Sequence, residues 1–282
     1  MGYFSDKVVL ITGGASGLGL SLAGGMGAAG AKVILADIQA DRATKEAAAL
    51  QEKGLDATAR HLDVTDRHQV EAVINEVAAS RGRLDILCNN AGTGLTGMTE
   101  DLSLDDWDRL IDLNLKSVIY GVQAAYPLMI HQGHGQIVNT ASFAGLVGLP
   151  GASPYSTTKH AVVGLTASLR SEAAVHGIRV SALCPTFVQT NIFDAMTTVN
   201  ISRAAAEEMV ANFGGAIAVE KFLKPALRGI RRNQARIILP GKAKVAWMVQ
   251  NLLPQLVSGQ SVKIARLARR HRQVKNFTPP KP

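Results

Sequence analysis

Short runs of apolar residues recur along the chain, and longer segments that mix apolar and polar residues separate them. The runs Val8–Ile11 and Val33–Ala36 contain only apolar residues, which is typical of parallel strands buried on both faces. Because strands and helices are expected to alternate up to about residue 240, the pattern predicts right-handed βαβ units and one doubly wound parallel sheet of the α/β class. The predicted strands are Lys7–Thr12, Ala31–Asp37, Thr58–Leu62, Leu84–Asn89, Gly135–Thr140, Arg179–Leu183 and Arg236–Leu239, and the predicted helices are Leu18–Ala29, Arg67–Ser80, Ser103–Ile130, Ser153–His176 and Val219–Arg231.

Length and composition agree with this fold class. A chain of 282 residues, 47% hydrophobic and 18% charged, has the composition of a globular protein and can bury a large core in one α/β domain. The sequence contains neither an apolar run long enough for a transmembrane helix nor a signal-peptide pattern at its start, so we expect a cytoplasmic protein. Cys88 and Cys184 both fall in apolar runs, and we expect two buried thiols and no disulfide.

Charge is distributed unevenly between the two ends of the chain. Residues 221–282 contain 15 of the 30 Lys and Arg residues and none of the 22 Asp and Glu residues, so they carry a charge of +15. The remaining residues 1–220 have 15 basic and 22 acidic side chains, a charge of −7. We therefore divide the chain into a main α/β domain, residues 1–240, and a basic helical C-terminal extension, residues 241–282.

The extension has two helical patterns and three interpretations. Apolar residues between Val245 and Val257 have helical spacing that Pro254 interrupts, and residues 262–272 form a basic amphipathic stretch. The stretch can pack on the main domain or on a partner subunit, can lie on an anionic membrane surface, or can bind nucleic acid. The nucleic-acid interpretation ranks last because the stretch has no interleaved aromatic residues. A membrane contact would be peripheral and would suit an apolar substrate.

A glycine-rich turn follows the first predicted strand. Gly13, Gly17 and Gly19 stand where a strand passes into a helix, and free N–H groups and the helix dipole at such a position suit a pyrophosphate. Asp37 ends the second predicted strand, where a carboxylate can accept hydrogen bonds from an adenosine ribose and repel a 2′-phosphate. The pair indicates NAD as the cofactor in preference to NADP.

A tyrosine and a lysine four residues apart supply candidate acid–base chemistry. Tyr155 and Lys159 share one face of a predicted helix, and Ser142 follows an apolar strand. A phenol is a poor base at neutral pH, but a nearby lysine cation and an oxidised nicotinamide would lower its pKa. The serine hydroxyl can orient a substrate oxygen. Together with the glycine turn, this set makes hydride transfer the leading hypothesis.

At this point the chain resembles the short-chain dehydrogenase/reductase family over roughly residues 5–240. The matching pieces occur in the family's order and spacing: Thr12-Gly13-x-x-x-Gly17-x-Gly19, Asp63-Val64, Asn89-Asn90-Ala91-Gly92, Asn114, Ser142, Tyr155-x-x-x-Lys159, and Pro185 with Thr190. The resemblance implies a single Rossmann-type domain with a seven-stranded parallel sheet.

The resemblance also implies roles for individual residues. Lys159 would hold the nicotinamide ribose, Asn114 would hold a water of a proton relay, and Asp63 would lie beside the adenine. The candidate catalytic residues are Asn114, Ser142, Tyr155 and Lys159, and the candidate cofactor residues are Gly13, Ser16, Gly17, Leu18, Gly19, Asp37, Ile38, Asp63, Val64, Asn90, Ala91, Gly92, Tyr155, Lys159, Pro185, Val188 and Thr190. No metal ligand is expected.

One position departs from the family pattern. The family usually has Pro-Gly after its strand at 180–184, whereas this chain has Pro185-Thr186, which leaves the path of that loop open because Thr lacks the backbone freedom of Gly.

Apolar residues dominate the segments expected around the substrate. The candidate substrate contacts are Ser142, Phe143, Leu149, Phe187 and Phe193. No Arg or Lys lies between Lys159 and Arg170 or between Arg179 and Arg203, so we expect no cation in the pocket that could bind a phosphate or carboxylate group of a substrate. A hydrophobic alcohol or ketone is therefore favoured.

The leading hypothesis is an NAD-dependent dehydrogenase or reductase of hydrophobic secondary alcohols and ketones, with Tyr155 as the acid and base. An NADPH-dependent ketoreductase of the same fold is the alternative, and a dinucleotide-binding regulatory protein without catalysis is a third hypothesis. We expect a homodimer or homotetramer, paired through the helices at 103–130 and 153–176, whose apolar residues include Leu110, Leu113, Val162 and Leu165.

Overall fold

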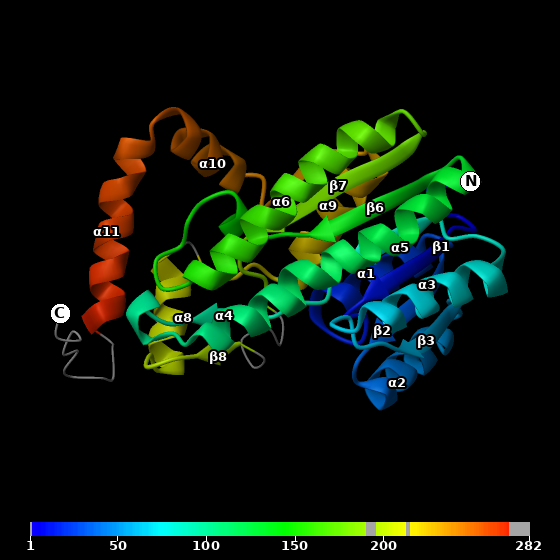
Figure 1. Ribbon diagram of the computed structural model, residues 1–282, viewed down its shortest axis with the longest axis horizontal. Coiled ribbons are helices and arrows are strands. Elements are labelled where there is room, and N and C mark those ends of the chain that lie inside the picture. The colour runs from blue at the N-terminus through cyan, green and yellow to red at the C-terminus, as the bar shows by residue number, and fades with distance from the viewer. Residues whose placement is uncertain (1, 190–195, 213–214, 271–282) are drawn as a thin grey trace.

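The computed structural model describes residues 2–189, 196–212 and 215–270. A parallel sheet of seven strands runs through its centre, in the order β3-β2-β1-β4-β6-β7-β9 (Figure 1). The expected doubly wound parallel sheet is confirmed. Its strands are β1 (Val8–Thr12), β2 (Lys32–Asp37), β3 (Ala57–His61), β4 (Ile86–Asn89), β6 (Gly135–Thr140), β7 (Ile178–Pro185) and β9 (Arg236–Leu239).

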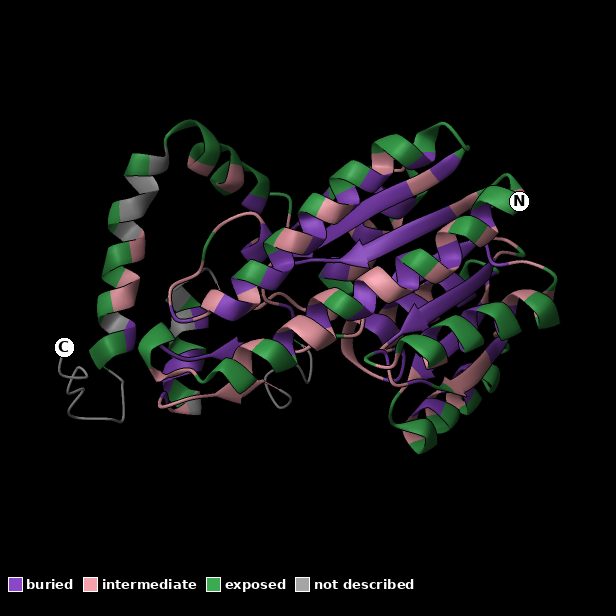
Figure 2. Cartoon of the chain, in the orientation of Figure 1, coloured by how far each residue is buried: buried purple, intermediate pink, exposed green. Residues whose placement is uncertain are grey.

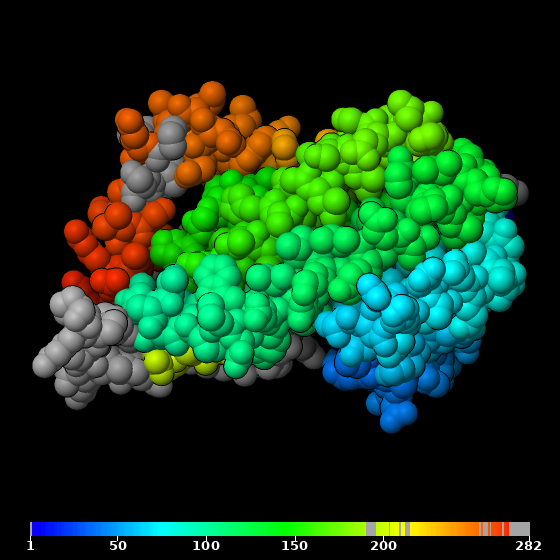
Figure 3. All heavy atoms as spheres, viewed as in Figure 1, coloured from blue at the N-terminus to red at the C-terminus, as the bar shows by residue number. Residues whose placement is uncertain are grey.

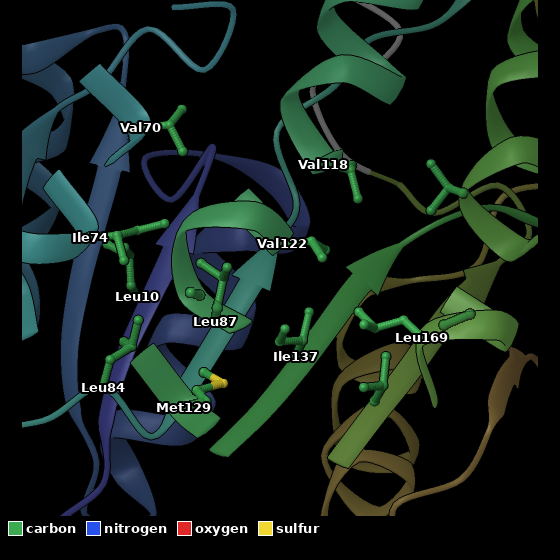
Figure 4. Close-up of a cluster of buried hydrophobic side chains, with 14 of the residues drawn as sticks. Leu10, Val70, Ile74, Leu84, Leu87, Val118, Val122, Met129, Ile137 and Leu169 are labelled. Carbon is green, nitrogen blue, oxygen red and sulfur yellow. The ribbon is translucent and has the colours of Figure 1, made fainter. Parts of the chain in front are cut away.

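Helices cover both faces of the sheet and enclose two separate apolar cores. One core includes residues of α3, α5 and α6, and the other includes residues of α1, α2 and α9. Figure 4 shows part of the first core, where Ile74 of α3 and Met129 of α5 lie near Leu10 and Leu87 of the central strands. The bounds of these helices are α1 (Gly17–Ala28), α2 (Ala40–Gln51), α3 (Arg67–Arg81), α5 (Ser117–Gln132), α6 (Ser153–Ala174) and α9 (Val219–Arg231).

Most predicted elements are confirmed to within three residues, but α2 was missed. Its buried residues are Ala43, Ala47 and Leu50, and two alanines and one leucine give a weak apolar stripe. The spacing of these buried residues is that of an amphipathic helix, but alanine is only weakly apolar, and Ala40, Ala48 and Ala49 lie off the stripe.

The single long helix predicted over residues 103–130 is confirmed in extent, because residues 104–132 are helical without a break, but its α-helical pattern is interrupted. The segment consists of α4 (Leu104–Ile111), a π-helical turn η2 (Asp112–Lys116) and α5. No glycine or proline marks this interruption. Its centre is Asn114, which is fully buried and hydrogen-bonded to another segment, so a tertiary contact accompanies a change in the helix that local sequence does not signal.

Further short elements lie beyond the carboxyl ends of the strands. The strands β5 (Leu95–Thr96) and β8 (Thr197–Thr198) pair in parallel, and α8 (Arg203–Asn212) follows β8. The sequence pattern predicted none of these three elements. Two-residue strands have no periodicity to detect, and most of the apolar residues in α8 are alanines, which mark a helical stripe only weakly.

The C-terminal extension begins with α10 (Ala243–Leu252) and continues with α11 (Pro254–Arg270). The predicted break at Pro254 is confirmed. Figure 1 and Figure 3 place α11 at the end of the molecule away from α2 and α3, and Figure 2 shows that much of both extension helices is exposed. Within the described residues, no helix is both long and apolar enough to cross a membrane.

Two residues expected at the interface between subunits are buried inside the single chain. Leu110 and Val162 are fully buried, so the expectation that they belong to a pairing face is wrong.

One end of the C-terminal extension packs on the main domain. Ala268, at the far end of α11, is fully buried, and packing on the main domain is thereby confirmed for that end. The membrane interpretation stays a prediction, and so does the nucleic-acid one.

A chain of buried amide and hydroxyl groups joins three elements beneath the strand ends. Asn89 of β4 donates a side-chain hydrogen bond to Asn139 of β6 over 2.9 Å, and Asn139 donates to the Thr166 hydroxyl of α6 over 3.0 Å. All three residues are buried. Each of these polar side chains has a hydrogen-bond partner. The hydrogen bonds therefore link β4 and β6 to α6 without leaving a buried polar group unpaired, which would cost stability.

We expect Asn139→Ala to lower the free energy of unfolding by about 2–4 kcal/mol, because it removes two buried hydrogen bonds and leaves polar groups of Asn89 and Thr166 without these partners. Urea denaturation followed by circular dichroism measures the loss. Asn251→Ala removes an exposed side-chain hydrogen bond to Trp247 and should cost less than about 0.5 kcal/mol. Equal losses in the two variants would contradict the role of the buried chain.

Candidate active site

The carboxyl ends of the central strands open into one apolar cavity of about 460 Å³. Strand order reverses between β1 and β4, and in doubly wound sheets ligands bind at such a switch point. The cavity is lined on one side by the glycine turn after β1 and on the other by residues of β6, α6 and the loop after β7. Of the candidate cofactor residues, it includes Gly13, Ser16, Gly17, Leu18, Asn90, Ala91, Gly92, Tyr155, Lys159, Pro185 and Val188.

The glycines of the turn are required by backbone geometry and by space. Gly13 and Gly17 have φ angles of +62° and +53°, which favour glycine. A Cβ atom at Gly19 would lie 2.1 Å from the Gly13 carbonyl oxygen, and one at Gly13 would lie 2.9 Å from the Ala91 Cα atom. The turn is therefore packed too closely for side chains and keeps a short, open backbone surface toward the cavity.

Thr12 and Asn90 hold the glycine turn against the neighbouring strand. The backbone N–H groups of Asn90 and Ala91 donate to the Thr12 hydroxyl over 2.9 and 3.0 Å, and the Asn90 side-chain amide donates to the Thr12 carbonyl over 3.1 Å. The Thr140 hydroxyl donates to the Asn90 side-chain oxygen over 3.3 Å. These bonds tie together the ends of β1, β4 and β6, so the expected cofactor residues Asn90 and Ala91 also set the shape of the site.

Asp37 lies at the end of β2 and its carboxylate faces the glycine turn. One carboxylate oxygen accepts from the Ala15 N–H over 3.1 Å, and the other accepts from the Gln39 N–H over 3.0 Å. A half-buried carboxylate thus stands beside the turn, as the sequence predicted. Ile38, the next residue, is 59% exposed and open to a ligand that lies along this edge.

Asp63 and Val64 lie outside the residues that line the cavity. The Asp63 carboxylate accepts from the backbone N–H and the hydroxyl of Thr65 over 2.9 and 2.7 Å, and Val64 is 7% exposed. In the chain by itself, Asp63 therefore stabilises the turn before α3, and its expected place beside an adenine stays a prediction.

Lys159 is the most buried charged group of the cavity. Its side chain comes from α6, only 4% of the residue is exposed, and its ammonium group donates to the Thr140 carbonyl at the end of β6 over 2.9 Å. Burial lowers the pKa of Lys159 from 10.5 to about 8, while the nearby Cys184 raises it. The cation is thus fixed to β6 at a cost in solvation.

Tyr155 lies one helical turn before Lys159 and faces the same cavity. The Lys159 ammonium nitrogen is 5.8 Å from the centroid of the Tyr155 ring. Burial raises the pKa of Tyr155 above its usual value of 10.0, and a hydrogen bond with Ser142 opposes that shift. In the chain by itself desolvation is the larger effect on the phenol pKa. The lowering expected from Lys159 together with an oxidised nicotinamide stays a prediction.

Ser142 completes the group two residues after the end of β6. It is 9% exposed, and its hydroxyl oxygen accepts from the Ala144 N–H over 3.1 Å. The structure thus brings the predicted trio of Ser142, Tyr155 and Lys159 together at one wall of the cavity.

Asn114 lies outside the cavity lining and its amide is fully engaged with the backbone of Thr93. The side-chain oxygen accepts from the Thr93 N–H and the side-chain nitrogen donates to the Thr93 carbonyl, both over 2.9 Å. A Cβ atom at Gly92 would lie 2.8 Å from the same Asn114 oxygen. The expected buried amide with partners is present, and it fixes the loop Gly92–Gly94 that lines the cavity. Its place in a proton relay stays a prediction.

The loop after β7 accepts threonine without backbone strain. Thr186 is absent from the residues with positive φ angles, and its N–H donates to the Leu239 carbonyl of β9 over 2.7 Å. The doubt raised by the missing glycine is therefore resolved for this segment. Thr190 and Phe193, which we also expected in the site, lie outside the described residues.

On the substrate side, the structure confirms some positions and adds others. Phe143, Leu149 and Phe187 line the cavity, as expected. Residues of α8 and of the extension also line the cavity, although no sequence pattern predicts them there. They are small or lie in segments with no motif, so spacing alone gave no signal. The added lining residues include Ala206 and Val210 of α8, Ile217, Pro240, Lys242, and Ala243 and Ala246 of α10. The exposed Lys242 brings a cation to the cavity lining, so the expectation that no cation lies there is wrong.

The residues present fit a nicotinamide dinucleotide. A turn with no room for Cβ atoms at Gly13 and Gly19 lies at the N-terminus of α1, where backbone N–H groups suit a pyrophosphate. Lys159 and Tyr155 lie farther along the same cavity. Gly13, Gly17 and Leu18 would hold the pyrophosphate, Asp37 the adenosine ribose and Lys159 the nicotinamide ribose.

Comparisons with known proteins agree with this geometry. The model of the short chain dehydrogenase family matches residues 7–200. The meso-2,3-butanediol dehydrogenase of Serratia marcescens is 39% identical over 217 residues, which cover 74% of this chain and 85% of that protein. The levodione reductase of Leifsonia aquatica is 38% identical over 213 residues, which cover 73% of this chain and 80% of that protein.

A solved structure shows the same fold over nearly the whole chain. A short chain dehydrogenase/reductase from Burkholderia phymatum in complex with NAD superimposes with a TM-score of 0.82 at 28% identity, covering 91% of this chain and 96% of that one. The chain belongs to the short-chain dehydrogenase/reductase family. It is an oxidoreductase with the fold by which this family binds a nicotinamide dinucleotide.

Replacing the buried cation should stabilise the protein. We expect Lys159→Met to raise the free energy of unfolding by about 2 kcal/mol at pH 7, because wild type must bury a charged group there and the variant does not. The pKa of Lys159 is about 8 in the folded chain, against the usual lysine value of 10.5. Between these values only the unfolded chain holds the proton, so wild-type stability rises with pH and the advantage of the variant shrinks.

Urea denaturation at pH 7 and pH 9.5 measures both effects. Lys45→Met, at an exposed position on α2, controls for the general effect of replacing lysine by methionine. A Lys159→Met variant that is less stable than wild type at pH 7 would contradict the desolvation argument.

Proposed function

We propose that this chain oxidises hydrophobic secondary alcohols, or reduces the corresponding ketones, with NAD(H) as the cofactor. The observation that supports the proposal is the meeting of Ser142, Tyr155 and Lys159 at the wall of an apolar cavity that also reaches the glycine turn. Structural packing alone does not account for a half-buried tyrosine hydroxyl, a buried ammonium group and a buried serine hydroxyl that face one cavity.

In this proposal each side chain has one task. The Ser142 hydroxyl donates a hydrogen bond to the substrate oxygen and orients it beside Tyr155. The phenolate of Tyr155 takes the proton from the alcohol oxygen, and in the reverse direction the phenol returns it to the ketone oxygen. When bound, the nicotinamide ring supplies the site that accepts or gives the hydride.

Lys159 sets the electrostatics of the proton transfer. Its cation lies 5.8 Å from the Tyr155 ring centroid and favours the charged phenolate over the neutral phenol. This attraction works against burial, which raises the pKa of Tyr155 in the chain by itself. Because the cation is bonded to Thr140, it keeps this position without needing to be reoriented during the reaction.

The apolar lining supports a substrate with little charge. Phe143, Leu149, Phe187 and Val210 contribute to the walls, and apolar walls favour an apolar ligand held by a few polar groups. Two relatives are named for meso-2,3-butanediol and levodione, both of which are small and uncharged. The substrate of this chain is proposed to share the lack of charge but to carry more apolar surface.

Assembly is the remaining part of the proposal. We propose a homodimer or homotetramer in the cytoplasm, since closed two-fold assemblies are the commonest kind among soluble oligomers. Leu104 and Val175 are 81% and 79% exposed and belong to the same two regions of the chain that we expected at the interface. Sedimentation at micromolar concentration gives the mass of the species and decides the point.

Removing the hydroxyl of Tyr155 should remove most of the turnover. We expect Tyr155→Phe to lower kcat by about 10²–10⁴-fold, because the ring still packs while the acid–base group is lost. Binding of NADH, measured by fluorescence titration, should stay within about threefold of wild type. Tyr126→Phe, on α5 and outside the cavity lining, is the control and should retain activity; full kcat in Tyr155→Phe would overturn the assignment.

The carboxylate of Asp37 should set the cofactor preference. We expect wild type to have a higher kcat/KM with NAD(H) than with NADP(H), and Asp37→Ala to narrow that ratio, because the variant loses both the repulsion of a 2′-phosphate and the bond to the ribose. Asp41→Ala, on α2 and exposed, should leave the ratio unchanged. A wild-type preference for NADPH would favour the ketoreductase alternative.

A further inference from the structure

The start of the C-terminal extension lines the cavity, and its far end contacts α8, a helix that also lines the cavity. At its start, Ala243 and Ala246 of α10 line the cavity directly. Ala243 is buried in the main core, and Trp247 packs against that core, so α10 is attached along this side. Near its far end, α11 contacts α8, and Figure 1 shows both helices at the same end of the molecule. The extension therefore spans from one side of the substrate region to another.

Helix α8 has one contact with the cavity and another with α11. Ala206 and Val210 line the cavity and are 2% and 8% exposed. Ala205, the residue before Ala206, is 3% exposed and belongs to a small apolar cluster with Ala268 of α11. A shift of α11 relative to this cluster would therefore move α8, and with it the two side chains of α8 that line the cavity.

The small cluster also includes segments that lead from the other cavity walls. Met98 follows β5, whose residues Leu95 and Thr96 line the cavity, and Ile201 follows β8. Ala268 is fully buried among these groups. Arg269 adds an ion pair with Glu100 over 3.1 Å, but 63% of the Arg269 side chain is exposed, so the pair contributes little. Among the side chains of α11 that the structure describes, Ala268 is the one that is fully buried.

The segments involved follow the part of the chain that the family model matches. That match ends at residue 200, after Ser142, Tyr155 and Lys159 and before α8, α10 and α11. The reacting groups thus lie on β6 and α6 of the matched region, whereas part of the substrate wall and its attachment are supplied by later residues.

We propose that Ala268 is a positioning residue for substrate specificity: by packing in the cluster that contains Ala205 of α8 it holds α8, and with it Ala206 and Val210, against the cavity. This inference rests on the proposed function for its substrate class, a hydrophobic secondary alcohol. A large alcohol contacts the wall that α8 forms, and a small one bound at Ser142 and Tyr155 does not reach it. The extension therefore favours large apolar substrates without touching the reacting atoms.

The first test does not depend on catalysis. In full-length Ala268→Asp, an unpaired charge is placed at a fully buried position, which should detach the end of α11. Hydrogen exchange followed by mass spectrometry should then show α8 amides exchanging about tenfold faster or more than in wild type. Val262→Asp introduces the same charge on α11 at a position that is 49% exposed, and it should leave α8 unchanged.

Two controls keep this test interpretable. Amides of β4 and β6 should exchange as in wild type in every variant, which shows that the sheet is folded. Ala268→Gly, which keeps the site apolar and uncharged, should leave α8 much less perturbed than Ala268→Asp does. Equal exchange of α8 in Ala268→Asp and Val262→Asp would overturn the positioning role.

The second test measures specificity with two alcohols that share one reacting group. Cyclohexanol is the small probe, and 4-cyclohexylcyclohexanol adds a second ring. In Ala268→Asp the KM for the larger alcohol should rise by about tenfold, while its kcat and the KM for cyclohexanol should stay within about twofold. A uniform fall in kcat for both alcohols would indicate general damage and would overturn the specificity role.

The outcomes separate this inference from the proposed function. If wild type turns over neither these alcohols nor the matching ketones with NAD(H), the proposed substrate class is wrong. The exchange of α8 still decides whether Ala268 positions that helix. If α8 loosens in Ala268→Asp and the two alcohols respond alike, the positioning role stands and its effect on specificity is overturned.

Discussion

The arrangement of the reacting groups depends on one buried cation. Lys159 reaches from α6 to the carbonyl of Thr140 at the end of β6, and this bond fixes the helix against the strand. Tyr155 lies one turn earlier on the same helix, and Ser142 lies two residues past the bonded carbonyl. Together with the bond of Asn139 to Thr166 and the apolar packing of α6, Lys159 holds in place the two elements that carry the hydroxyls. Burial lowers the pKa of Lys159 to about 8, so the site keeps this charge at the expense of stability.

Two layers of polar contacts support that attachment from the sheet. At the strand ends, Asn90 connects Thr12 of β1 with Thr140 of β6. One layer deeper, Asn139 connects Asn89 of β4 with Thr166 of α6. Because the strands are parallel, their carboxyl ends lie at one edge, and short side chains can span neighbouring strands there. The glycine turn and the proton-transfer groups are thus parts of one bonded frame, which limits how far either can move relative to the other.

The sequence predicted those features that depend on local pattern. Strand periodicity, the glycine spacing and the pair Tyr155 and Lys159 were sufficient for the parallel sheet and for one wall of the site. Contacts between distant segments were not predictable in this way. The π-helical turn accompanies the bonds of Asn114 to Thr93, and the burial of Leu110 and Val162 depends on packing that spacing cannot reveal. The raised pKa of Tyr155 likewise reflects burial, which a list of neighbouring charges does not supply.

The reacting groups lie on rigid elements of the sheet domain, whereas part of the cavity wall lies on the later helices α8, α10 and α11. Reacting groups must be held to within a fraction of an ångström, and β6 and α6 provide this through the buried bonds of Lys159 and Thr166. The outer walls need only exclude water and match an apolar surface, which small side chains do well. Ala206, Ala243 and Ala246 of the later segments leave space in the cavity that larger residues would fill. Substitutions in α8, α10 and α11 can therefore alter substrate specificity while the geometry of proton transfer stays the same. In our proposal the packing of Ala268 couples α11 to the part of the wall that α8 forms.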